Sequence, residues 1–256
     1  MMKEFEIDDE YKIVHNSDTE HWDYHKNEKP LPKEAEVLYK FYSLNINNLD
    51  ALLNNYFYIS NPGDFNDPFD CNINLIENND NVELEKLKIP QRNKYGNMGI
   101  FSFSETIDNH LMWAHYTNNY QGFALKFKGD NIQVLPKPGQ FKRQTLTRVI
   151  YPSALKPIKR EFPFAQHYVF TNKLNHWSYE KEWRIIAELG DEKNRILYYE
   201  PTIVEALYVG YKLIDNNESA YRLILGIHEE RFPNVPVYVV YPHKTELKLN
   251  FEKVLN

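Results

Sequence analysis

The sequence predicts an α+β fold, in which helices pack against a mixed, mainly antiparallel sheet. The first observation is that segments with the period of a β-strand recur along the chain, as in Ile100–Ser104, where Phe101 and Phe103 alternate with two serines. The second is that segments with helical spacing lie between them. Met112 and Tyr116, for example, are four residues apart and share one helix face.

Composition and charge exclude several classes of protein. The net charge is −6, so the chain as a whole is not a nucleic-acid-binding protein, and any such binding needs a local basic patch. Cys71 is the only cysteine, which excludes a disulfide within the chain and is typical of the reducing cytoplasm. The first residues lack a signal-peptide pattern, and no apolar run is long enough to cross a bilayer. We therefore expect a cytoplasmic protein that does not contact membranes.

Two regions of the chain differ in composition. Residues 1–36 are acidic and irregular and close with Pro30 and Pro32, so we expect an N-terminal arm with one short helix. Residues 37–256 carry strand and helix patterns with enough apolar side chains for a core, which predicts a single α+β domain.

The elements of this domain follow from the hydrophobic period. The predicted strands span residues 37–42, 56–59, 100–104, 123–127, 180–189, 203–210 and 235–240. The predicted helices span residues 46–53, 112–116, 162–174 and 220–227. Ser43 or Asn45 caps the first helix, whose apolar stripe begins at Ile46, and Pro236 marks an edge strand. Residues 77–95 are charged and helical at most, and the last residues form one more strand or a tail.

The segment SNPGDFNDPFDC is dense in turn-forming residues. Asp64, Asp67 and Asp70 are spaced three apart in it, and we expect Phe65 and Phe69 to anchor it to the core. Two interpretations stay open. The loop grips a ligand or a metal ion, or its side chains accept hydrogen bonds from their own backbone in Asx turns.

A second informative segment is HWSYEKEWRIIAELG. As a strand it directs Glu182 and Arg184 toward the same side, beside two tryptophans, which predicts the edge of a working site. Catalysis without a metal or cofactor motif generally uses a carboxylate in a partly dry pocket, and Glu182 fits that description. The alternative is a simple ion pair between Glu182 and Arg184 on a solvated face of the sheet.

No complete catalytic motif is present: the sequence has no Gly-Lys-Ser phosphate loop, Rossmann fingerprint, HExxH pair or GxSxG elbow. We therefore assemble a candidate site from scattered polar and aromatic groups. The expected catalytic residues are Glu182, Ser104 and Lys40. The expected ligand-binding residues are Tyr39, Asn66, Asp67, Ser102, Trp113, His115, Tyr116 and Arg184. For His115 the simpler alternative is a hydrogen-bonded or capping histidine.

The segment Lys137–Arg160 contains seven basic residues and no acidic one. Such a segment suits the phosphates of a nucleotide or of a nucleic acid. The alternative interpretation is a solvated basic face that offsets the acidic N-terminal region.

Four motifs in order, LYKFYS, SNPGDFNDPFDC, FSFSETIDNHLMWAHYTNNYQGFALKF and WSYEKEWRII, closely resemble a mostly bacterial family known as domain of unknown function 2971. The resemblance extends from Val37 to about Gly210. It implies no established activity. Because members of the family often look like accessory genes of mobile or defence islands, the resemblance implies a toxin or antiphage effector.

A remoter resemblance is to the split-sheet ADP-ribosyltransferases, and it implies a split sheet and NAD as substrate. Carried over by position, Tyr39 or Lys40 would hold NAD on the first strand, and Ser102 or Ser104 would orient it. This chain departs from the pattern on the first strand, where those enzymes usually have His or Arg and this sequence has Tyr-Lys-Phe.

The same resemblance implies roles for three further residues. Tyr116 would stack on nicotinamide, and Glu182, or alternatively Glu205, would be the late acidic residue. Two other functions stay open. One is a nuclease with Mg²⁺ held by Asp67, Asp70, Glu180 and Glu182. The other is a non-catalytic module that binds a nucleotide or peptide; under the NAD hypothesis no metal is expected.

Overall fold

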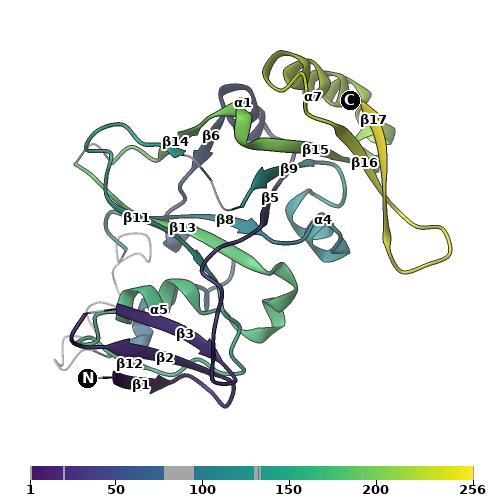
Figure 1. Cartoon of the computed structure of the whole chain (residues 1–256). Coiled ribbons are helices and arrows are strands. Elements are labelled where there is room, and N and C mark those ends of the chain that lie inside the picture. Colours follow the sequence, from purple (N-terminus) through teal and green to yellow (C-terminus); the bar gives the residue numbers. More distant parts are fainter. Residues whose placement is uncertain are drawn as a thin grey trace.

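The computed structural model describes most of the chain as an α+β protein (Figure 1). The described residues are 2–19, 21–77, 95–129, 132, 134–191 and 193–255. The sheets are mainly antiparallel and include parallel pairs, so the predicted fold class is confirmed at this level. Segment 77–95, predicted to be helical at most, lies almost entirely outside the described residues.

An eight-stranded sheet forms the centre of the molecule. In spatial order its strands are β11 (Phe141–Arg148), β13 (Glu182–Leu189), β8 (Met98–Ser104), β5 (Val37–Tyr42), β9 (Phe123–Lys128), β15 (Val204–Gly210), β16 (Val237–Pro242) and β17 (Leu249–Leu255). Neighbours are antiparallel except β15 and β16, whose parallel pairing requires a crossover that α6 (Tyr211–Asn216) and α7 (Glu218–Arg231) supply.

This sheet is split between β5 and β8. The two strands share a single residue pair, Tyr39 with Ser104, whereas β5 pairs with β9 over its full length. At its other end β8 pairs with Ser60 through Ile100. The edge of β8 between these two bridges therefore faces β5 without a backbone ladder, and the sheet opens there.

Three smaller sheets complete the fold. The first contains β1 (Met2–Glu6), β2 (Tyr11–Asn16), β3 (His21–Lys26) and β4 (Lys29–Pro30), the second contains β10 (Val134–Leu135), β14 (Ile196–Tyr199) and β6 (Tyr56–Tyr58), and the third contains β12 (Ile158–Lys159) and β7 (Ile76–Glu77). The predicted irregular N-terminal arm with a short helix is therefore wrong in its secondary structure. The many acidic residues of this region make it look irregular, but its apolar residues recur with the period of a strand, as in Tyr11 with Ile13 and in Trp22 with Tyr24. The domain boundary at residue 36 stays a prediction.

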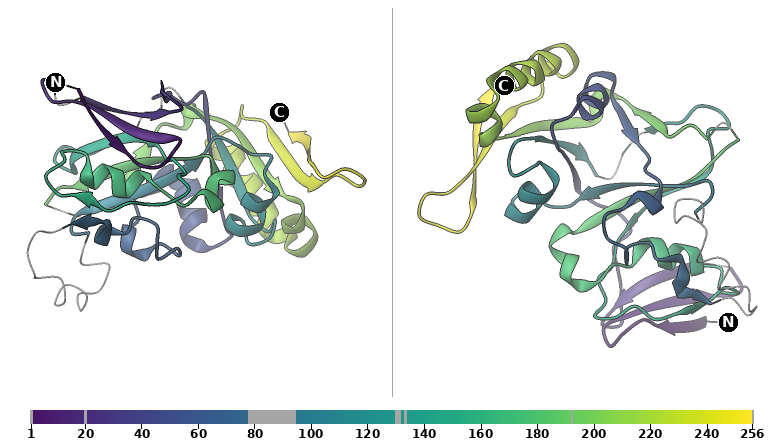
Figure 2. Two further views of the ribbon diagram at one scale, coloured as in Figure 1. Left: turned by 90° about the horizontal axis from the view of Figure 1, so that it is seen from below. Right: turned by 180° about the vertical axis from the view of Figure 1, so that it is seen from behind.

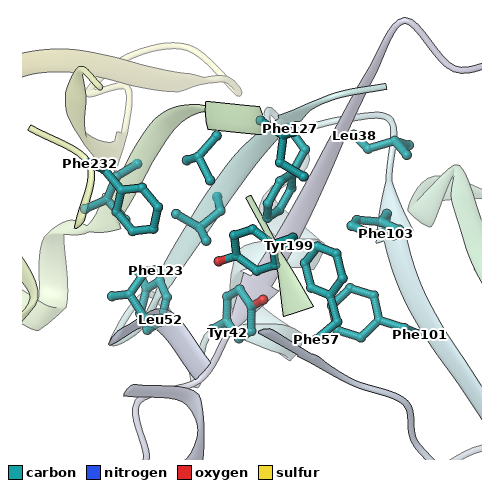
Figure 3. Close-up of a cluster of buried hydrophobic side chains, with 14 of the residues drawn as sticks. Leu38, Tyr42, Leu52, Phe57, Phe101, Phe103, Phe123, Phe127, Tyr199 and Phe232 are labelled. Atoms are coloured by element: carbon teal, nitrogen blue, oxygen red, sulfur yellow. The ribbon is translucent and has the colours of Figure 1, made fainter. Parts of the chain in front are cut away.

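The largest core cluster is aromatic and lies between the central sheet and the sheet of β6 and β14 (Figure 3). The Phe57 ring lies 4.4 Å from the Phe101 ring and 4.5 Å from the Tyr199 ring, measured between centroids. Phe103 and Phe127 meet the same ring edge-on. Since each aromatic side chain buries a large apolar area, this cluster holds the apolar face of β8 in place.

A second cluster joins the N-terminal sheet to α5 (Ala165–Thr171), which lie side by side in Figures 1 and 2. Ile13 and Tyr24 are buried there against Tyr168, and the Tyr24 hydroxyl is 2.6 Å from Thr171 Oγ1. Ile186 of β13 belongs to the same cluster. The strand β13 is therefore covered on both of its faces.

The other helices within the described residues are α1 (Ile46–Asn54) and α4 (His110–Tyr116), and short 3-10 helices span Pro62–Asp64, Ile73–Leu75, Asn175–Glu180 and Pro201–Ile203. Of the two predicted caps, Asn45 is the one used: its side chain accepts the Asn48 N–H at 2.9 Å. Ile46 is wrong as the start of the apolar stripe because it is 78% exposed, and α1 instead buries Ala51 and Leu52.

Two edges of the central sheet differ from the prediction. Pro236 does not mark an edge, because β16 lies between β15 and β17, and the Pro236 carbonyl accepts the Leu207 N–H at 3.0 Å. The last residues form the edge strand β17, one of the two predicted alternatives. The opposite edge is β11, a strand within the basic segment that the sequence pattern does not indicate. Within the described ranges, none of the helices combines the length and apolarity needed to cross a bilayer.

Candidate functional site

A cavity of about 780 Å³ opens at the split in the central sheet. Its wall comes from β5, β8 and the start of β13, together with the loop after Asn61 and the end of α4. Most of the predicted site residues line it, namely Tyr39, Lys40, Asn66, Ser102, Ser104, Tyr116, Glu182 and Arg184. The sheet therefore brings together side chains that are far apart in the sequence.

Arg184 is the centre of a buried ion-pair network on this wall. It has no exposed surface, and its guanidinium binds Asp70 through two nitrogens, at 2.9 and 2.6 Å. It also binds Glu182 through two nitrogens, at 2.8 and 3.0 Å. The predicted ion pair between Glu182 and Arg184 is therefore present, but it is buried rather than on a solvated face.

Lys173 is the second cation of the network. Its ammonium is 2.6 Å from Glu180 Oε2 and 3.5 Å from one carboxylate oxygen each of Asp70 and Glu182. Two cations thus face three carboxylates in a place that water barely reaches. With all three carboxylates ionised, the group carries one net negative charge. The carboxylate that the two cations stabilise least is therefore the one that binds a proton most readily.

The two glutamates of this network titrate in opposite directions. Burial alone would raise the pKa of Glu182, but Arg184, Lys173 and the Ser102 hydroxyl outweigh it and lower that pKa to about 2. Burial and then the negative charge of Glu182 raise the pKa of Glu180 to about 7, against the opposing effect of Lys173 and the Tyr116 hydroxyl. Glu180 is therefore the group that can exchange a proton near neutral pH.

The local backbone explains how both glutamates reach the cavity. Glu180 ends the 3-10 helix Asn175–Glu180, and Lys181 then takes a left-handed conformation with φ of 44° before β13 begins at Glu182. Ser104 fixes this turn from the next strand, because its hydroxyl donates to the Glu180 carbonyl oxygen at 2.5 Å. Its hydroxyl also accepts the N–H of Thr106 at 3.1 Å, so Ser104 supports the turn rather than pointing a free hydroxyl at a ligand.

Of two further predicted residues, one bonds to the network and the other lies beside it. The Tyr116 hydroxyl of α4 donates a hydrogen bond to Glu180 Oε1. Lys40 of β5 extends its ammonium across the split and donates to the Ser102 carbonyl at 3.0 Å. Burial lowers the pKa of Lys40 to about 8, opposed by the negative charge of Glu182.

Three predicted ligand-binding residues do not line the cavity. Trp113 lies in the hydrophobic core with no exposed surface, where its indole N–H donates to the Ile107 carbonyl at 2.8 Å and its ring packs near Phe41. His115 and Asp67 line a separate, more open hollow of about 500 Å³. The His115 ring lies 3.1 Å from the Tyr179 hydroxyl, which matches the alternative of a hydrogen-bonded histidine.

The Asp-rich loop contains one of the expected Asx turns, whereas Asp70 has a role that neither interpretation gave. Asp67 accepts the Phe69 N–H at 2.9 Å, which is an Asx turn, whereas Asp70 is buried against Arg184. Phe65 is an anchor as predicted, since its ring packs against the second core cluster and lies 5.5 Å from the Arg184 guanidinium carbon. Phe69 is 59% exposed and anchors nothing. Tyr39 lines the cavity but is only 9% exposed, and its ring contacts Tyr208.

The sequence prediction missed Lys173, placed Asp70 in a loop that grips a ligand or metal ion or forms Asx turns, and gave Glu180 a role only in a metal site. Lys173 follows α5 with no motif around it, so only the fold reveals its role. The signal for Glu180 was available in the sequence, as two glutamates two residues apart before an arginine. Glu205, the alternative late acidic residue, forms an ion pair with Lys126 at 3.0 Å. Neither of these two residues lines the cavity.

The geometry does not favour the magnesium nuclease. Among the described residues, no group of three or more His, Cys, Asp or Glu side chains is arranged to hold a metal ion. Asp70 and Glu182 already use both of their carboxylate oxygens on Arg184, and Asp67 lies outside the cavity. In the basic segment, Arg143 pairs with Glu188, Arg148 with Glu105 and Lys159 with Glu161.

One family comparison matches this chain. The family model described as "Protein of unknown function (DUF2971)" matches residues 112–185, a stretch from α4 to Ile185 in β13. The match supports the family that the four sequence motifs indicate. Neither the curated proteins nor the solved structures contain a match to the chain.

Proposed function

We propose that the cavity is the active site of an enzyme that acts on a nucleotide-type small molecule, with Glu180 as the residue that gives or takes a proton. The observation that carries this proposal is the raised pKa of Glu180, about 7, beside a cavity of about 780 Å³. Cavities of roughly 300–1,000 Å³ are typical of small-molecule sites, and perturbed titratable groups concentrate in such sites.

The cavity offers a ligand three kinds of contact. The Lys40 ammonium can bind a phosphate or carboxylate, because its only hydrogen-bond partner among the described groups is a backbone carbonyl. The side chains of Asn48 and Asn66 add polar groups to the lining, and Tyr116 adds an aromatic ring. Together these groups suit a molecule with an anionic part and a flat ring.

The charge of the network favours one reaction in particular. When Glu180 is ionised, the three carboxylates of the network exceed its two cations by one charge. With the Lys40 ammonium bound to an anionic group of the substrate, this excess favours a positive charge that develops elsewhere on the substrate. Loss of nicotinamide from NAD develops such a charge on the ribose. We therefore propose NAD cleavage of the ADP-ribosyltransferase type as the first reaction to test, and a toxin or antiphage effector as the biological role.

The test is release of nicotinamide from NAD by the purified full chain, followed by chromatography between pH 5 and 9. We expect Glu180→Gln to lower the rate by roughly 100-fold or more, the usual size of a general acid–base contribution. The matched control is Glu205→Gln, a glutamate on the same sheet that pairs with Lys126 outside the cavity. The control should retain the wild-type rate. Absence of NAD binding and cleavage at every pH, or equal rates in both variants, contradicts the proposal.

A non-catalytic binding module is the second candidate. It is supported by the polar and aromatic lining of the cavity, in which Lys40, Asn66 and Tyr116 can contact a ligand. Arg184 would not take part, because its hydrogen bonds go to Asp70, Glu182 and the backbone of Phe170. Such a module would bind a nucleotide without turning it over, and Glu180→Gln would leave the affinity unchanged. Isothermal titration with NAD and with AMP therefore separates binding alone from catalysis.

A further inference from the structure

The cavity contains two lysines in contrasting surroundings. Lys173 is within 3.5 Å of three carboxylates, which hold it as a charged ammonium. Lys40 forms no ion pair within the described part of the chain. Its Nζ atom donates one hydrogen bond to the Ser102 carbonyl and lies 4.2 Å from the centroid of the Phe101 ring.

A carbonyl partner has a different effect from a carboxylate partner. It can accept an N–H from either a neutral amine or an ammonium, and although the bond from the ammonium is the stronger one, a carbonyl adds no full negative charge that would retain the proton. The hydrogen bond from Lys40 to Ser102 therefore fixes the direction of the side chain across the split. The remaining positions on Nζ are free to face the cavity that both residues line.

We propose that Lys40 is a nucleophilic amine, which forms an imine with an aldehyde- or ketone-bearing small molecule in the cavity. Lysines act in this way when an apolar surrounding disfavours their charged form. Burial lowers the pKa of Lys40 to about 8, so a useful fraction of the amine is neutral at physiological pH. The titratable and charged groups that line the cavity with it are Tyr39 and Tyr42 on β5, Tyr56 and Tyr58 on β6, Tyr116 on α4, Glu182 and Arg184 on β13, and Glu180, Lys173 and Asp70.

Of these groups, Glu182 is the one that acts on Lys40, and its negative charge opposes the lowering. The charge of Glu182 does not cancel the effect of burial on the Lys40 pKa, because Arg184 binds both oxygens of the Glu182 carboxylate.

The reaction balances without any co-reactant. The lone pair of Nζ forms a C–N bond to the carbonyl carbon, and the carbonyl C–O bond breaks in the second step. Both amine hydrogens leave with that oxygen as water, so no oxidant or reductant is needed. Glu180 lines the same cavity and can carry a proton from the amine to the departing oxygen, since its pKa is raised to about 7.

This inference does not depend on the proposed NAD reaction. It rests on the surroundings of Lys40, whereas the proposed function rests on Glu180. Failure of NAD cleavage leaves the reactivity of Lys40 unaffected, and failure of imine formation leaves the role of Glu180 unaffected.

The experiment is a short pulse of a carbonyl compound followed by sodium borohydride, which reduces an imine to a stable secondary amine. Two probes of different size are used on the wild-type full chain, pyridoxal 5′-phosphate and glyceraldehyde, and peptide mass spectrometry locates the label. At pH 7.5 we expect Lys40 to be labelled roughly tenfold faster than the exposed Lys128, because more of its amine is neutral. This advantage should disappear near pH 10, where surface amines also lose their protons.

The variant Lys40→Arg keeps the positive charge and cannot form the imine. It should lose the fast label and retain the slow label on Lys128. Because the wild-type protein alone gives the rate ratio, the result does not depend on how well the variant folds. The proposal is overturned if neither probe labels Lys40 faster than Lys128, or if Lys173 is labelled first.

Discussion

Strand β13 carries an arginine–glutamate ion pair at each end, and the two pairs have nearly the same distance. At one end Arg184 Nε is 2.8 Å from Glu182, and at the other Arg143 Nη2 is 2.9 Å from Glu188. The Arg184 side chain is 1% exposed, whereas the Arg143 side chain is 82% exposed. The two pairs therefore share a short distance and differ in burial. They also differ in their bonding, because Arg184 binds both oxygens of Glu182 and Arg143 binds one oxygen of Glu188.

This difference shows that burial decides what an ion pair does in this protein. Water screens the charges of Arg143 and Glu188, so removal of either side chain costs little unfolding free energy. Around Arg184 no water replaces a missing partner, and every carboxylate depends on its cations. The same lack of water shifts the pKa values of Glu180 and Glu182 in opposite directions and gives the cavity its chemistry.

The largest effect is expected from breaking the buried pair. Arg184→Met leaves Asp70 and Glu182 in the interior without their main cation, and removal of one partner from a buried pair costs about 3–5 kcal/mol of unfolding free energy. Urea unfolding followed by circular dichroism measures the loss. The control replaces all three residues, with Asp70→Leu and Glu182→Leu added, and should recover part of the stability because no unpaired charge remains. If Arg184→Met lowers the unfolding free energy by less than about 1 kcal/mol, burial does not make this ion pair more important than an exposed one.

The next effect is a dependence of stability on pH that comes from Glu180. Its pKa rises from 4.5 in the unfolded chain to about 7 in the folded one, so the folded state binds the proton more tightly. The resulting stability is fully present below pH 4.5 and is lost as the pH rises through 7, with a total on the order of 3 kcal/mol. Glu182 acts in the opposite sense, and its contribution is lost only as the pH falls from 4.5 toward 2.

Urea unfolding at pH 5 and at pH 7.5 separates these contributions. Burial lowers the pKa of His167 to about 3, so this histidine adds stability over the same interval and opposes the loss from Glu180. The test is therefore the difference between the proteins: from pH 5 to pH 7.5, Glu180→Gln should change in stability more favourably than the wild type because glutamine does not titrate. Glu205→Gln, which changes a half-exposed glutamate outside the cavity, should keep the wild-type dependence. An identical pH dependence in the wild type and Glu180→Gln would show that Glu180 does not hold the proton.

Much of the fold is predictable because local period decides it. In β8 and β13 the aromatic and aliphatic residues alternate with polar ones, and the core receives Phe101, Phe103 and Trp183 as that pattern indicates. The N-terminal sheet could not be recognised in the same way, since its acidic residues dominate the composition and its buried residues, such as Ile13, are few. The edge strand β11 was missed because half of its residues are exposed, none is fully buried, and the exposed ones show no alternation.

The sequence predicted most of the residues that line the candidate site, but it did not predict what each of them does. The sequence places Glu182 and Arg184 on one face of a strand, but their pairing with Asp70 depends on a loop folded from a distant part of the chain. Whether a carboxylate is solvated or buried is a property of the tertiary structure. For that reason the sequence favoured Glu182 as the proton-exchanging group, and the structure favours Glu180.

The smallest effect is expected at the exposed end of β13, where the comparison can be sharpened. Arg143→Met removes a pair whose partner Glu188 remains in contact with water, so the unfolding free energy should fall by about 0–1 kcal/mol. In addition, the difference between variant and wild type should vanish in 1 M NaCl, where salt screens exposed charges within about 3 Å, while the deficit of Arg184→Met should persist. Urea unfolding at low and high salt measures both variants. If salt removes the deficit of Arg184→Met as well, the buried network exchanges with solvent, and burial does not distinguish the two ends of the strand.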